Sequence, residues 1–159
     1  QAKRDSENAF KRLAKKDFNV TIARCFSFVG TYLPINQHFA IGNFIANGLN
    51  GDDIEVNADR LVFRSYMFAD DLVEWLLTLA ENSDKSCQVY NVGSDVEVEI
   101  GDLAYIISRI FDVNVNFRFK NRKKTNRYIP SIDKAKKELG LRTKLDLRES
   151  IIRSLSKTK

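Results

Sequence analysis

The chain of 159 residues has only two cysteines, Cys25 and Cys87, and one histidine, His38. The cysteines lie in apolar, strand-like surroundings without CxxC spacing, so we expect two reduced, buried thiols rather than a disulfide or a metal site. A single histidine leaves no Ser–His–Asp pattern to consider. The sequence therefore predicts no metal centre and no hydrolytic triad.

Glycine-rich phosphate loops are also absent, since neither GxGxxG nor GxxxxGK[ST] occurs. Long apolar runs are lacking as well, because charged residues interrupt each of them, and this excludes a transmembrane helix. No segment resembles a secretory signal. We therefore expect a cytoplasmic protein without a membrane partner.

The residues that are present favour a folded domain with an anionic ligand. Hydrophobic residues make up 43% of the chain, which is enough for a core. The length suits one domain or a piece of a larger one. The net charge of +5 is compatible with either nucleic acid or a phosphorylated small molecule.

Helical and strand patterns alternate along the sequence, which predicts an α/β fold. Apolar spacing predicts helices near 1–16, 38–49, 99–111, 131–139 and 146–156, and a further helix capped by Asp70 or Asp71 with apolar positions at Leu72, Trp75, Leu76, Leu79 and Ala80. Strands are expected in "FNVTIARCFSFVG", "DIEV", "LVFRSYMF", "CQVYNVGS" and "VNVNFRF". Only the first and fourth look buried on both faces, too few for a self-sufficient doubly wound sheet.

Three arginines stand out in this pattern. Arg24 interrupts an apolar strand, where we expect it to pair with a carboxylate such as Asp71 or to position a strand end that meets a ligand. Arg64 and Arg127 are each either an ordinary surface residue or a phosphate ligand, because a guanidinium can bond two oxygens at once.

A basic cluster at Lys120, Arg122, Lys123 and Lys124 could in principle bind nucleic acid. It lacks the aromatic interleaving of single-strand binders, and no nucleic-acid-binding signature occurs in the chain. We expect a solvated loop and no nucleic-acid partner.

Five segments in this order, "QAKRDSE", "ARCFSFVG", "FRSYMFADDLVEWL", "VYNVGS" and "NRYIPSIDKAKKELGL", resemble the C-terminal half of the extended short-chain dehydrogenase/reductases. These are NAD(P)-dependent nucleotide-sugar epimerases and dehydratases. The resemblance covers essentially the whole chain and is nearest to members similar to dTDP-glucose 4,6-dehydratase, ahead of UDP-galactose 4-epimerase. It implies that residues 1–30 end a Rossmann-type nucleotide-binding domain. Residues 31–159 would mainly form the small mixed α/β substrate-binding domain, with 66–92 returning to the Rossmann sheet.

The opening "QAK" resembles the end of the family's YxxxK motif, which implies that Lys3 is the lysine that binds the nicotinamide ribose and lowers the pKa of the catalytic tyrosine. That tyrosine would lie two residues before Gln1. The resemblance thus implies a segment cut from a longer parent that uses NAD or NADP and forms a homodimer. The isolated segment is expected to be inactive and not to retain the cofactor.

The resemblance also implies a set of ligand-binding residues. Cys25 would lie near the nicotinamide. Arg64 matches the arginine that grips the sugar-nucleotide diphosphate, and Asp71 matches a structural aspartate. The other positions expected to bind substrate are Ser27, Phe39, Ile41, Asn43, Asn91 and Arg127, although Asn91 equally suits a strand-ending turn.

Two departures from the family pattern affect these expectations. Ser27 stands where many members have an asparagine that bonds phosphate, and serine is shorter and offers no amide N–H. Ala58 and Arg60 stand where relatives have a Gly-x-Gly turn, which implies an altered loop.

The expected function is the substrate-binding part of a nucleotide-sugar dehydratase or epimerase, with 4,6-dehydration of an NDP-hexose as the first choice. The alternatives are a 4-epimerase or 4-reductase, or a non-catalytic module that binds nucleotide sugars.

Overall fold

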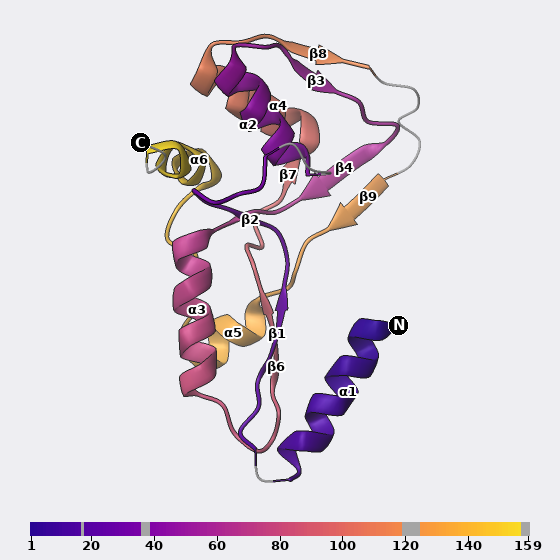
Figure 1. The fold of residues 1–159 in the computed structure, drawn as a ribbon, viewed down its shortest axis with the longest axis vertical. Helices are drawn as coiled ribbons and strands as arrows, with labels where there is room; N and C mark the ends of the chain where they lie inside the picture. The colour runs from indigo at the N-terminus through magenta and orange to yellow at the C-terminus, as the bar shows by residue number, and fades with distance from the viewer. Residues whose placement is uncertain (17, 36–38, 119–124, 157–159) are drawn as a thin grey trace.

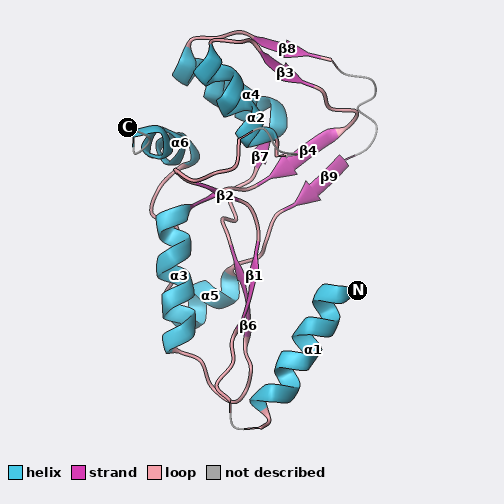
Figure 2. Ribbon diagram, viewed as in Figure 1, coloured by secondary structure: helices cyan, strands magenta, loops and turns pink. Residues whose placement is uncertain are grey.

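The computed structural model describes residues 1–16, 18–35, 39–118 and 125–156. The expected cluster at Lys120 and 122–124, and His38, lie outside these ranges. The helices are α1 (Ala2–Ala14), α2 (Ala40–Asn50), α3 (Ala69–Glu81), α4 (Ile100–Phe111), α5 (Asp133–Leu139) and α6 (Leu147–Ser156). Each corresponds to a helix predicted from apolar spacing (Figure 2).

The strands are short and mostly parallel, which confirms the predicted α/β class. Three parallel pairs join β1 (Ile22–Cys25) to β6 (Val89–Val92), β2 (Phe28–Val29) to β5 (Met67–Phe68), and β3 (Ile54–Val56) to β8 (Val115–Phe117). In a further three-stranded sheet, β4 (Leu61–Arg64) lies between β9 (Thr125–Tyr128), which is parallel to it, and β7 (Val98–Glu99), which is antiparallel.

Two hydrophobic clusters hold these elements together. The first cluster comprises Val29, Ile41, Phe44, Ile45, Ile54, Val56, Ile100, Leu103, Ala104, Ile107 and Ile151. Its helices α2 and α4 pack beside β3 and β8 at the top of Figure 1. The second cluster comprises Met67, Trp75, Leu79, Tyr90, Val92, Ile132, Ala135 and Leu141. Its helix α5 contacts β6 and its helix α3 contacts β2 and β5, and both helices lie in the lower half of the same view.

Two glycines mark where elements meet at short range. A Cβ on Gly48 of α2 would lie 2.2 Å from the ring of Phe111, so the absence of a side chain lets α2 approach α4. A Cβ on Gly93, directly after β6, would lie 3.1 Å from Cβ of Phe26 and 3.2 Å from Cγ of Pro130. The absence of a side chain at the glycine of "VYNVGS" therefore lets Phe26 and Pro130 approach the chain directly after β6.

The first expected strand is divided in two. The chain leaves its pairing with β6 at Cys25 and pairs with β5 from Phe28, with Phe26 N–H still bonded to the carbonyl of Val92 at 3.0 Å. Within the described ranges β1 has a partner on one side only, so its last two residues are exposed. The prediction that both cysteines are buried is therefore wrong for Cys25, whereas Cys87 is buried; both are free thiols.

Arg24 does pair with a carboxylate, but the expected partner Asp71 was wrong. Its Nε and Nη2 donate to Oε1 and Oε2 of Glu7 at 2.7 Å each, joining β1 to α1. Because Arg24 lies at the exposed end of β1, its partner comes from the helix on that side rather than from α3. On α1 itself, the apolar residues Phe10 and Leu13 are exposed.

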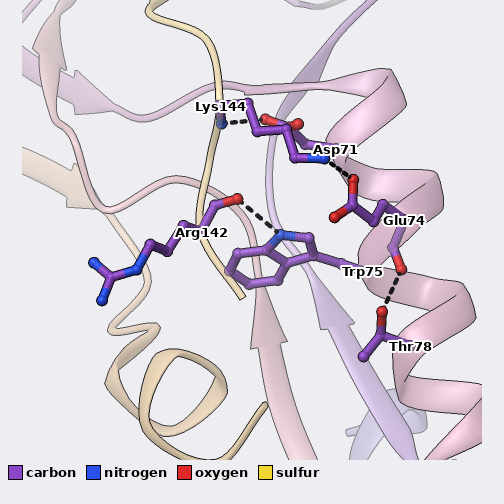
Figure 3. A network of polar contacts seen from close by, with 6 residues as sticks. All are labelled: Asp71, Glu74, Trp75, Thr78, Arg142 and Lys144. Atoms are coloured by element: carbon purple, nitrogen blue, oxygen red, sulfur yellow. Dashed lines mark hydrogen bonds and ion pairs between the residues drawn. The ribbon is translucent and has the colours of Figure 1, made fainter. Parts of the chain in front are cut away.

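Asp70 and Asp71 do not cap α3 as predicted, because the helix begins at Ala69 and both lie in its first turn. Asp71 is buried and its Oδ2 accepts the backbone N–H of Lys144 at 2.9 Å. Figure 3 shows this contact together with the indole N–H of Trp75 donating to the carbonyl of Arg142, and the ion pair between Lys144 and Glu74. The segment after α5 is thus tied to α3.

No helix in the described part of the chain is both long enough and apolar enough to span a bilayer.

Candidate functional site

A cleft of about 1130 Å³ opens beside the carboxyl ends of β2 and β4. Residues 26–34, the start of α2, residues 55–59 and the stretch from Arg64 to Asp70 form most of its walls. The first hydrophobic cluster contributes Ile41 to the wall, and Phe28, which packs against the second cluster, lines the cleft as well. In α/β proteins the carboxyl ends of parallel strands are the usual place for a ligand.

Five of the residues predicted to bind substrate line this cleft together: Ser27, Phe39, Ile41, Asn43 and Arg64. They come from three separate segments of the sequence, so the fold is what assembles them. Phe39 and Asn43 are exposed, whereas Ile41 is buried and contributes to the first cluster as well as to the wall.

Arg64 ends β4 with its guanidinium held along one edge. Its Nη1 donates to the carbonyl of Phe63 at 2.7 Å, to the carbonyl of Asn126 at 3.3 Å and to Oδ1 of Asn126 at 3.2 Å. Within the described ranges every hydrogen bond of this guanidinium leaves from Nη1. Nε and Nη2, which form the side-on edge that suits two phosphate oxygens, remain available to a ligand.

Arg127 and Asn91 are not among the residues that line the cleft. The Arg127 side chain lies over the ring of Phe63 at 5.9 Å and pairs with Glu97 at 2.6 Å. Successive strand residues face opposite sides, so Arg127 lies on the face of β9 away from Arg64. Asn91 donates to the carbonyl of Ser131 at 2.9 Å and so ties β6 to the segment before α5.

Lys3 and Cys25, the two residues predicted to contact the cofactor, are neighbours of each other but also lie outside the cleft lining. Although Cys25 as a residue is exposed, partial burial of its sulfur raises the pKa of the thiol, and the positive charge of Lys3 offsets part of this rise. The electrostatic contact is consistent with α1 lying alongside the end of β1.

Several aromatic side chains of the cleft were missed by the sequence analysis, among them Phe26, Tyr66 and Tyr128. The rings of Phe26 and Tyr128 stack with centroids 4.6 Å apart and planes at 26°. Tyr128 is the register partner of Arg64 in the β4·β9 pair. Strand alternation could have identified it, because Asn126 and Tyr128 necessarily share the face opposite to Arg127.

The phenol of Tyr66 is partly buried in the cleft wall. Burial raises its pKa to about 12, and the nearby charge of Arg64 opposes this rise. Tyr66 is therefore a neutral hydrogen-bonding group at physiological pH rather than a base.

The altered turn between β3 and β4 also contributes to the cleft. Ala58 and Asp59 line it, and Arg60 donates from Nε and Nη2 to the carboxylate of Asp59. An ion pair between Asp59 and Arg60 thus lies in the loop that was expected to differ from the Gly-x-Gly turn of the relatives. Across the part of the chain that the structure describes, no three His, Cys, Asp or Glu side chains gather as a metal site.

Comparison with known proteins agrees with this geometry. Residues 1–93 match the NAD dependent epimerase/dehydratase family. UDP-glucuronic acid decarboxylase 2 of Arabidopsis thaliana is 31% identical over 134 residues, which are 83% of this chain and 30% of that protein. UDP-glucuronic acid decarboxylase 1 of Xenopus tropicalis is 27% identical over 98% of this chain and 37% of its own length. The chain thus spans about a third of these curated relatives.

Solved structures share the fold. A UDP-glucose 4-epimerase from Thermotoga maritima, determined with UDP-glucose, superposes with a TM-score of 0.83 at 21% identity, covering 98% of this chain and 51% of that one. The Bordetella bronchiseptica enzyme WbmF, in complex with NADH, gives a TM-score of 0.81 at 21% identity, covering 94% and 48%. The matched family accounts for more than half of the residues, and the chain therefore belongs to the NAD-dependent epimerase/dehydratase family.

Proposed function

We propose that this chain forms the part of an NAD(P)-dependent nucleotide-sugar enzyme that binds the sugar nucleotide. The observation that carries the proposal is Arg64 at the wall of the cleft, with Nη1 held by protein oxygens and the Nε–Nη2 edge available. A diphosphate presents paired oxygens that fit such an edge. The apolar and aromatic walls suit the nucleoside and the carbon face of a sugar.

The relatives favour a UDP-linked sugar ahead of the dTDP-linked hexose that the sequence suggested first. The Arabidopsis and Xenopus proteins are named for UDP-glucuronic acid, and the Thermotoga structure contains UDP-glucose. Decarboxylation, 4,6-dehydration and 4-epimerisation are the three reactions to be compared. Within this proposal UDP-glucuronic acid is the first substrate to test.

Lys3 and Cys25 are the residues of this chain that would contact the dinucleotide. Lys3 is exposed, and its positive charge offsets part of the rise in the pKa of the Cys25 thiol, so the two side chains lie near each other. Cys25 is at the carboxyl end of a parallel strand, where ligands usually bind, and an ammonium group there can donate hydrogen bonds to ribose hydroxyls. When bound, NAD or NADP would accept a hydride from the sugar. The contribution of this chain is to bind and orient the sugar nucleotide.

The test is calorimetry and turnover with the full-length protein that carries this chain. We expect UDP and UDP-sugars to bind, and UDP-glucuronic acid to be converted in the presence of NAD. Binding without any turnover would favour the non-catalytic nucleotide-sugar module. Failure to bind UDP, dTDP or their sugars would overturn the proposal.

A further inference from the structure

The guanidinium of Arg64 receives two of its three contacts from Asn126, a residue 62 positions further along the chain. One contact is to the backbone carbonyl at 3.3 Å and the other to Oδ1 at 3.2 Å. An arginine has several rotatable bonds, so an isolated side chain would sample many positions of its head group. Asn126 restricts the head group by holding Nη1.

The strand that carries Asn126 is itself fixed on both faces. On one face Tyr128 stacks on Phe26, which packs against Gly93. On the other face Arg127 lies over Phe63 and pairs with Glu97. Parallel pairing with β4 sets the register, with Asn126 opposite Val62 and Tyr128 opposite Arg64. Asn126 therefore presents its acceptor from a strand with side-chain contacts on both faces.

We infer that Asn126 is a positioning residue, which orients the Arg64 guanidinium so that the Nε–Nη2 edge faces an incoming diphosphate. Asn126 is not part of the cleft lining and acts through Arg64. The neutral amide oxygen suits this role, because it accepts a hydrogen bond without neutralising the positive charge that attracts phosphate. The inference rests on the proposed function and adds a residue to the same site.

The experiment is a double-mutant cycle in the full-length protein with UDP as the ligand. The variants are Asn126→Ala, Arg64→Ala and the double variant, and calorimetry measures the Kd of each. We expect Asn126→Ala to weaken UDP binding about tenfold, in line with the loss of a hydrogen bond to a charged group. In the Arg64→Ala background the same change should have little further effect.

Two controls separate positioning from a general loss of structure. Thr125→Ala alters an exposed residue of the same strand, on the face away from Arg64, and should leave UDP binding unchanged. Uridine, which has no phosphate, should bind equally to the wild type and to Asn126→Ala. Asn126→Val, which keeps a strong strand former but lacks an acceptor, provides a second variant with the same expected loss.

The outcomes distinguish the two proposals. If the wild type fails to bind UDP, the proposed function fails and this inference fails with it. If the wild type binds UDP but Asn126→Ala and Asn126→Val bind it equally well, only the positioning role is overturned. Equal losses in the wild-type and Arg64→Ala backgrounds would also overturn it, because Asn126 would then act independently of Arg64.

Discussion

The carboxylate of Asp71 accepts the backbone N–H of Lys144, so the first turn of α3 is joined to the segment that connects α5 with α6. Asp71 is 4% exposed, and its removal would leave a partly buried N–H without an acceptor. We expect Asp71→Ala to lower the free energy of unfolding by about 1–3 kcal/mol. Urea denaturation followed by the fluorescence of Trp75, which lies on the same helix, measures this loss.

The matched variant is Asp71→Asn, whose amide oxygen can still accept the bond, and it should lose much less stability. Glu74→Gln, which breaks only the exposed ion pair with Lys144, should leave the urea midpoint nearly unchanged. Equal destabilisation by Asp71→Ala and Asp71→Asn would show that the hydrogen bond is not what Asp71 contributes.

Arg64 and Arg127 lie in neighbouring strands but on opposite faces, and their substitutions should differ accordingly. We expect Arg64→Lys to weaken UDP binding about 10- to 100-fold, because an ammonium cannot bond two phosphate oxygens side-on. Arg127→Lys should change UDP affinity by less than about twofold, since its partners are Glu97 and Phe63. A larger loss of UDP affinity for Arg127→Lys than for Arg64→Lys would show that Arg127, and not Arg64, contacts the diphosphate.

Tyr66 should make stability depend on pH in the alkaline range. Its pKa is about 12 in the folded protein against an ordinary value of 10.0, so the neutral phenol stabilises the fold fully below pH 10. This contribution is lost as the pH rises from 10 to about 12. At pH 11 the loss is about 1 kcal/mol.

Urea denaturation of the wild type and of Tyr66→Phe at pH 9 and pH 11 isolates this effect, because other titrating groups are shared. The wild type should lose more stability between the two pH values than Tyr66→Phe does. Identical losses would mean that the phenol of Tyr66 ionises as readily in the folded protein as in the unfolded chain.

The ion pair between Glu7 and Arg24 should stabilise the fold at neutral pH and not at acidic pH. The hydrogen bonds from Arg24 hold the pKa of Glu7 below its ordinary value of 4.5. The stabilising contribution is therefore complete above pH 4.5 and disappears as the pH falls through the lowered pKa. The melting temperatures of the wild type and Glu7→Gln should differ at pH 6 and converge as the pH falls below the lowered pKa of Glu7.

Because both side chains are solvent-accessible, the difference at pH 6 should also shrink in 1 M salt. Glu149→Gln, which breaks an ion pair with Arg153 inside one helix, is the comparison, since it does not join two elements. A difference in melting temperature between the wild type and Glu7→Gln that stays constant as the pH is lowered would point to packing by the Glu7 stem instead of its charge.

Helices were predictable from the sequence because their apolar period is local. The face of α4 with Ile100, Leu103 and Ile107 is buried as expected. On α3 the period correctly selected Trp75 and Leu79, but Leu76 and Ala80 are exposed. One apolar stripe of this helix contains Trp75 and Leu79 and an adjacent one contains Leu76 and Ala80, and the surrounding tertiary structure decides which stripe is buried.

The site was predictable only in part, for a reason that lies in strand geometry. Arg64 was identified through family resemblance, and five of the expected substrate residues do meet in one cleft. The segment that forms β9 was not predicted as a strand, and Arg127 was selected there for its charge, whereas Asn126 and Tyr128 lie on the same face as Arg64. A difference of one residue in a strand reverses the face, and sequence alone did not reveal which parity pairs with Arg64.

The two hydrophobic clusters draw on alternating stretches of the chain. Val29 and Ile54 belong to the first cluster, Met67 and Val92 to the second, Leu103 to the first again, Leu141 to the second and Ile151 to the first. No single division of the sequence places all residues of one cluster on one side and all residues of the other cluster on the other side. Neither cluster can close before Leu141 and Ile151 are available, so we expect the two clusters to form together rather than one after the other.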